Sequence, residues 1–397
     1  MLLFFGVSML RAGNTATRTR EWIEVIARKM GLDAVAVSLS LDSITASARR
    51  DGEWTTTMRE IGPPGINALR IAELEQLAKT AAPGLAPREI AARLAEIEST
   101  TPRYSSVLIA AAVGAASGGF AFLNGAAVPE LIAATIGGGV GQCLRLWLSR
   151  RQVNHYSAAA LSAAAASGMY VLAAVALART VGFGFAHYPA GFIASVLFLI
   201  PGFPLIAALF DLLQYQTVAA VSRLAYGVMI LLAVTLGLSI VIAVAGIDLT
   251  RQPPFDLAYP LKLLLRGVAS FVAGGAFAML FNSSPRMILA AGLLALAANG
   301  LRLVLNDMGM MLAPSAFFAA LTIGLVAMVV DRRFNVPRMA VIVAPTVIMM
   351  PGIYAFEMIV LFNRGQVLDA LQASASCGFV IVAMAMGLAT ARFLSRN

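Results

Sequence analysis

The sequence predicts a mainly α-helical, polytopic membrane protein in which two five-helix repeats of inverted topology follow a small soluble α+β domain. Of its 397 residues, 59% are hydrophobic and only 12% are charged, about half the charged fraction of a typical soluble domain. The first 106 residues hold 13 of the 29 Lys and Arg residues and 12 of the 20 Asp and Glu residues. The remainder divides into long apolar runs, each close to the roughly 20 residues that a bilayer-spanning helix requires.

Residues 1–103 carry both helical and strand signals. Some segments repeat their apolar residues at the spacing of a helix, and others alternate apolar and small residues, as strands do. Asp51-Gly52 separates two of the strand-like segments and predicts a tight hairpin. The expected helices cover 18–30, 67–80 and 87–98, and the expected strands cover 35–39, 44–50 and 54–61. This composition predicts a small α+β domain.

Ten membrane spans are expected after this domain. Proline-glycine pairs interrupt the fourth and the ninth of them. The expected spans are Ser105–Leu123, Ala127–Leu148, Tyr156–Val181, Ala190–Leu213, Leu224–Ala245, Leu263–Phe281, Met287–Leu305, Leu312–Val330, Met339–Leu361 and Leu368–Ala391.

The ten spans form two sets of five that resemble each other. Gly118-Gly119 in the first span matches Gly274-Gly275 in the sixth, and Pro201-Gly202 in the fourth has its counterpart 150 residues later in the ninth. A unit with an odd number of spans forces the second unit to enter the membrane upside down, which gives an inverted repeat. We therefore expect a first repeat over 104–246, a loop over 247–262 and a second repeat over 263–397.

The basic residues predict the orientation. The net charge is +9, but the excess lies at the ends of apolar runs, so we expect no nucleic-acid partner and interpret the charge as anchoring to the bilayer. If residues 1–103 are cytoplasmic, ten basic residues of the later chain fall inside and six outside, with Arg150-Arg151 and Arg332-Arg333 inside. We expect a protein of the inner membrane with both termini in the cytoplasm.

The two interrupted spans are the predicted substrate site. A proline inside a span frees backbone groups, which is tolerated where the helix lines a cavity or packs inside protein. Each break creates a helix N-terminus suited to a carboxylate and a helix C-terminus suited to a cation, as a zwitterionic amino acid would need. The alternative is a pair of kinks that serve packing alone. The candidate substrate-binding residues are Pro201, Gly202, Pro204, Pro351, Gly352 and Tyr354.

Three carboxylates in or beside spans are candidates for proton coupling. Asp211 and Glu357 follow the two proline-glycine breaks, and Asp307 ends the seventh span. A carboxylate within a span is costly and is a functional hypothesis by default. The structural alternative is an ion pair with a membrane arginine such as Arg223 or Arg302.

The sequence gives little sign of metal, cofactor or enzymatic chemistry. His155 and His187 are isolated, so we expect no metal site and no cofactor. In residues 1–103, a hydroxyl nucleophile such as Ser38 would have no recognisable base, so we expect no enzyme.

Several short segments, taken in order, resemble the threonine/serine exporter family. They are Arg11–Ala16 and Asn67–Arg70 in the soluble domain, Ile200–Leu205 followed by Asp211, and Met350–Tyr354. The resemblance covers nearly the whole chain. It implies export of L-threonine and L-serine driven by the proton motive force, with the first break and Asp211 as the first candidate region.

Two other functions are compatible with the sequence. One is a membrane-anchored enzyme with a hydrolase-like N-terminal domain, and the other is a passive solute channel. A homo-oligomer packed through the glycine-rich run Val113–Gly119 is also open, although packing within one chain explains that run equally well.

Overall fold

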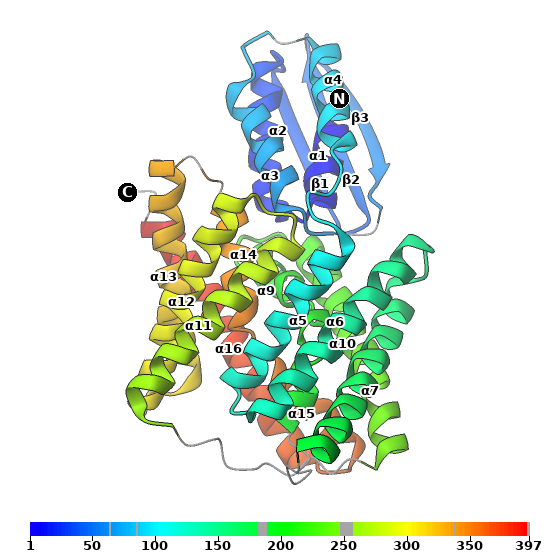
Figure 1. Ribbon diagram of the computed structural model, residues 1–397. Helices are drawn as coiled ribbons and strands as arrows, with labels where there is room; N and C mark the ends of the chain where they lie inside the picture. Colours follow the sequence, from blue (N-terminus) through cyan, green and yellow to red (C-terminus); the bar gives the residue numbers. More distant parts are fainter. Residues whose placement is uncertain are drawn as a thin grey trace.

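The computed structural model describes residues 1–62, 65–84, 86–181, 189–246, 257–334, 336 and 338–394. A small α+β domain stands at one end of a bundle of long helices (Figure 1). His187 and most of the expected loop over 247–262 lie outside the described residues.

The N-terminal domain packs helices against an antiparallel sheet of order β1-β2-β3. Its elements are α1 (Leu2–Arg11), α2 (Ala16–Lys29), β1 (Ala34–Leu39), β2 (Ser43–Arg50), β3 (Glu53–Glu60), α3 (Ala68–Thr80) and α4 (Pro87–Ser99). The hairpin turn has positive φ at both Asp51 (53°) and Gly52 (85°), as the sequence predicts. Helix α1 was not expected. It forms because Phe5 and Met9, both 0% exposed, complete the core of this domain.

The bundle contains eight continuous helices that are long and apolar enough to cross a membrane, counted among the described residues. They are α5 (Ser106–Leu123), α6 (Val128–Arg150), α7 (His155–Val181), α10 (Thr217–Ala245), α11 (Tyr259–Leu280), α12 (Pro285–Asp307), α13 (Leu312–Phe334) and α16 (Val367–Leu394). They coincide with eight of the ten expected spans.

The other two expected spans are bent helix pairs. The fourth comprises α8 (Pro189–Ala194), a 3-10 turn η1 (Leu197–Leu199) and α9 (Gly202–Leu212), and the ninth comprises α14 (Arg338–Ile348) and α15 (Gly352–Asn363). The bends are 62° and 50°.

The backbone at the two breaks is the same. Pro201 has φ −77° and ψ 54°, and Pro351 has φ −78° and ψ 55°. In each break the glycine N–H donates across the proline to a carbonyl at 2.8 Å, that of Ile200 for Gly202 and that of Met350 for Gly352.

Helices α5 and α11 run in opposite directions relative to the N-terminal domain. Helix α5 begins directly after that domain, whereas α11 ends beside it, where the Ala68 N–H donates to the Phe281 carbonyl at 2.8 Å. The Tyr104 hydroxyl donates to the carbonyl of Ser283, just beyond α11, also at 2.8 Å. These two helices therefore point in opposite directions.

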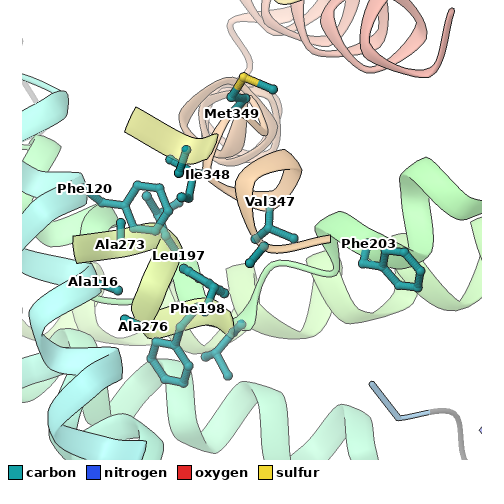
Figure 2. Packing of buried hydrophobic residues seen from close by; sticks show 14 of the residues in the cluster. Ala116, Phe120, Leu197, Phe198, Phe203, Ala273, Ala276, Val347, Ile348 and Met349 are labelled. Carbon is teal, nitrogen blue, oxygen red and sulfur yellow. The ribbon is translucent and has the colours of Figure 1, made fainter. Parts of the chain in front are cut away.

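The centre of the bundle is apolar and built around the two breaks. Phe120 of α5 and Phe277 of α11 meet edge to face with ring centroids 5.7 Å apart. Side chains of both breaks, including Leu197 and Val347, converge beside these helices (Figure 2). A Cβ added at Gly352 would lie 2.6 Å from Leu197 Cδ2. This close approach requires a residue without a side chain.

Candidate functional site

A cavity of about 330 Å³ lies between the N-terminal domain and the bundle, and we call it the near cavity. Its volume falls in the range of small-molecule sites. Its walls come from the N-terminal domain, from α6, α7, α10 and α11, from the first break and from Val347 of α14. The polar side chains in its lining are Ser40, Gln142, Arg145, Ser149, His155, Arg223 and Tyr226, and no carboxylate of the described residues joins them. The near cavity is therefore positively charged.

One face of α6 supplies three of these polar side chains. Gln142, Arg145 and Ser149 follow one another at i, i+3 and i+7, so they lie on one side of the helix. Gln142 is 1% exposed, and its Oε1 has no hydrogen-bond partner among the described residues. Arg145 keeps an exposed side chain that lines the cavity. It has no ion pair or hydrogen bond within the described part of the chain. Both groups are available to a ligand.

A second pair of polar groups lies in the wall of the near cavity. His155 at the start of α7 and Tyr226 on α10 are hydrogen-bonded, with 3.2 Å between Nδ1 and the hydroxyl oxygen. Either atom can be the donor, depending on the imidazole tautomer. The pair joins α7 to α10 and gives the cavity a group that can donate to an oxygen ligand.

Arg223 connects the near cavity to an interdomain contact centred on Asp211. The Asp211 carboxylate is 0% exposed and lies 3.5 Å from Arg223 Nε. It accepts the backbone N–H groups of Ala16 (3.2 Å) and Thr17 (3.3 Å) at the first turn of α2, where the helix dipole favours a negative charge. Arg223 also donates to the Asn14 carbonyl at 2.8 Å. These contacts, which we call the docking pair, hold the N-terminal domain on the bundle.

A second cavity, of about 360 Å³, lies among α8, α15 and α16, and we call it the far cavity. Helix α15 lies at the end of the bundle away from the N-terminal domain (Figure 1). In contrast to the near cavity, the far cavity has both acidic and basic side chains. Its polar lining residues are Tyr354, Glu357, Arg364, Asp369, Gln372 and Ser376.

The structure divides the predicted substrate-binding residues between the two cavities. Pro201, Gly202 and Pro204 line the near cavity, and Tyr354 lines the far one. Pro351 and Gly352 form the turn between α14 and α15, where the second break packs against the first. The first turn of α9 offers fewer donors than expected, because Gly202 uses its N–H within the break and Pro204 has none.

The three predicted coupling carboxylates lie in different places. Asp211 belongs to the docking pair. It forms the ion pair with Arg223 that the sequence offered as the alternative to a role in proton coupling. Asp307 pairs with Arg266 at 2.6 Å, and Glu357 lines the far cavity.

Sequence reasoning missed the polar face of α6 as a site. Neither Arg145 nor Gln142 was predicted as a site residue. The available signal was a polar residue at each turn of an otherwise apolar helix. His155 and Tyr226 could not be joined from sequence, because 71 residues separate them and only the packing of α7 on α10 brings them together.

Two family models match the chain in succession. ThrE, which describes a threonine/serine exporter, matches residues 1–245, and ThrE_2, described as a threonine/serine exporter, matches residues 266–394. The gap between the two matches lies at the junction of the two sets of five spans.

Two curated relatives are similar to part of the chain. Both carry the name "Probable succinate transporter subunit YjjP". The Escherichia coli K12 protein is 25% identical over 246 residues, which are 61% of this chain and 92% of that protein. The Klebsiella aerogenes protein is 27% identical over 244 residues, 60% of this chain and 90% of that protein. No solved structure matches. Since the ThrE model alone covers more than half of this multi-pass membrane protein, the chain belongs to the threonine/serine exporter family.

Proposed function

We propose that this protein is a secondary active transporter that exports small carboxylate-bearing solutes and binds their carboxylate on Arg145 in the near cavity. The observation that carries the proposal is an exposed arginine that has no partner among the described residues, in a cavity that no described carboxylate lines. A guanidinium binds a carboxylate through two parallel hydrogen bonds. Gln142, Tyr226 and His155 can add polar contacts around it.

The charge of the near cavity favours an anion over a zwitterion. L-Threonine and L-serine carry an ammonium group, for which the near cavity offers the neutral acceptor Gln142 Oε1 but no described carboxylate, because Asp211 is fully buried and engaged in the docking pair. A dicarboxylate such as succinate, which the relatives' name mentions, places no cation in the cavity. We therefore propose that succinate binds more tightly than either amino acid, although all three share the carboxylate.

The proposed architecture is the inverted repeat expected from sequence, over 104–246 and 263–397. The matching geometry of the two breaks and the opposite directions of α5 and α11 support it. The relatives are named as subunits and match about three fifths of this chain. We therefore propose that the second repeat of this chain takes the place of a separate partner subunit of those relatives. We further propose that both termini are cytoplasmic, as the positive-inside bias indicates.

Proton coupling is proposed with Glu357 as the first candidate group. It lines the far cavity, together with Arg364 and Asp369, where a proton would meet the solute pathway.

The test is flux in liposomes containing the purified protein. Labelled succinate, L-threonine and L-serine are each measured with an imposed pH gradient and after the gradient is collapsed. Saturable succinate flux that follows the gradient is the expected result. Flux that neither saturates nor responds to the gradient would indicate a channel. No flux of any of the three solutes, with insertion confirmed, would refute the proposal.

A further inference from the structure

Arg302 occupies in α12 the place that Arg145 occupies in α6. Both helices have 23 residues, and each arginine stands 17 residues after the first residue of its helix. Three residues before each helix lies a residue with positive φ, Gly125 (86°) in one case and Asn282 (56°) in the other. Asn299 likewise corresponds to Gln142. The two polar faces are therefore structural counterparts.

The two arginines are in different states. Arg145 faces the near cavity without a partner among the described residues. Arg302 is half-buried and donates through Nε to Asn299 Oδ1 at 2.9 Å and through Nη1 to the Met349 carbonyl at 3.4 Å. Met349 lies just before the second break. The corresponding carbonyl in the first break belongs to Leu199, which lines the near cavity. No described hydrogen bond joins Arg145 to it.

The far cavity occupies the position in the second half that the near cavity occupies in the first. Three of its lining residues, Tyr354, Ala373 and Ser376, stand 150 residues after lining residues of the near cavity, which are Pro204, Arg223 and Tyr226. Arg145 lines the near cavity, but Arg302, engaged with the second break, is not part of the far lining. The far cavity is thus the counterpart of the near cavity, except that Arg302, the counterpart of Arg145, does not line it.

We propose that Arg302 is the second carboxylate-binding residue of the transport cycle. In the opposite-facing conformation it releases the Met349 carbonyl and lines an enlarged far cavity. Arg145 at the same time donates to the Leu199 carbonyl, and the near cavity closes. Two repeats that exchange their conformations around a fixed centre account for access from either side. The ligand is the small carboxylate of the proposed function, on which this inference rests.

The test compares succinate binding with succinate exchange for Arg302→Gln. Binding of labelled succinate to the detergent-purified protein reports the near cavity. Counterflow exchange in liposomes at equal pH requires both cavities. We expect Arg302→Gln to bind within about threefold of the unmodified protein and to lose exchange by roughly 10- to 100-fold, the loss typical of a charged hydrogen bond. Arg286→Gln, which removes an exposed arginine at the start of the same helix α12, is the matched control and should change neither.

Two results would overturn the inference. One is exchange by Arg302→Gln at the unmodified rate. The other is a monodisperse Arg302→Gln protein that loses succinate binding as well as exchange. Arg302 would then be required for binding in the near cavity and would not act in the opposite-facing conformation alone. If Arg302→Gln is not recovered folded, Arg302→Lys carries the test, since it keeps the charge but not the paired donors. Its exchange should fall while its binding stays. Absence of succinate binding by the unmodified protein would refute the proposed function itself, and this inference with it.

Discussion

Replacing Asp211 by Asn tests whether the docking pair holds the N-terminal domain on the bundle. The carboxylate is 0% exposed, accepts two backbone N–H groups of α2 and pairs with Arg223, which is itself 6% exposed. The amide has nearly the same shape but only one acceptor oxygen, so one N–H loses its partner and the arginine charge stays uncompensated. Breaking a buried ion pair on one side costs about 3–5 kcal/mol, and we expect a loss in that range.

The assay is chemical unfolding of the detergent-purified protein, with proteolysis of the segment between the two domains as a second measurement. Asp307→Asn is the matched control. Its ion pair with Arg266 is partly exposed, so the expected cost is below about 1 kcal/mol. A loss below about 1 kcal/mol for Asp211→Asn as well would refute the structural role. If such a stable variant also lost pH-driven flux, Asp211 would return as a proton-coupling group.

Three further predictions concern packing and the interface. Gly237→Ala should destabilise the bundle by about 1–3 kcal/mol, because the new Cβ would lie 2.2 Å from the Ala160 carbonyl oxygen. Gly378→Ala is the control, since nothing lies within 4 Å of the Cβ it adds, and it should stabilise the protein by about 0.5–1 kcal/mol. Thermal unfolding measures both variants, and equal effects would contradict the packing described. Gly352→Ala should lower succinate flux roughly tenfold by separating the two breaks, whereas unchanged flux would show that the breaks need not touch. Arg392→Gln removes contacts from α16 to Glu21 and Gln214. The free energy of unfolding should fall by less than about 1 kcal/mol, because these side chains are partly exposed. A loss that is larger at high salt than at low salt would contradict this prediction, because salt screens a surface ion pair.

Most of the fold could be predicted because local rules and bilayer thickness determine it. Asp51-Gly52 predicted the hairpin, and the proline-glycine pairs predicted the positions of both broken spans. Helix α1 could not be predicted, since its ten residues gain stability only from the core that they join. The bends of 62° and 50° likewise depend on how the two breaks pack against each other.

The candidate site was only partly predictable, because its residues meet through long-range packing. Proline and glycine at the first break mark the near cavity in the sequence. Asp211 stood out as a carboxylate in a span, yet its contacts with α2 and Arg223 join residues about 195 and 12 positions away in the chain. Arg145 looks in sequence like any arginine near the end of a span, and only the cavity that it lines distinguishes it from an anchor.

Binding of labelled succinate and labelled L-threonine to the purified protein and to Arg145→Gln tests the central claim most directly. Arg150→Gln, whose arginine bonds Ser106 outside the near cavity, is the control. We predict saturable binding, tighter for succinate than for L-threonine, that weakens by roughly 10- to 100-fold in Arg145→Gln and is unchanged in the control. Equal succinate affinity in Arg145→Gln and the unmodified protein would contradict the account.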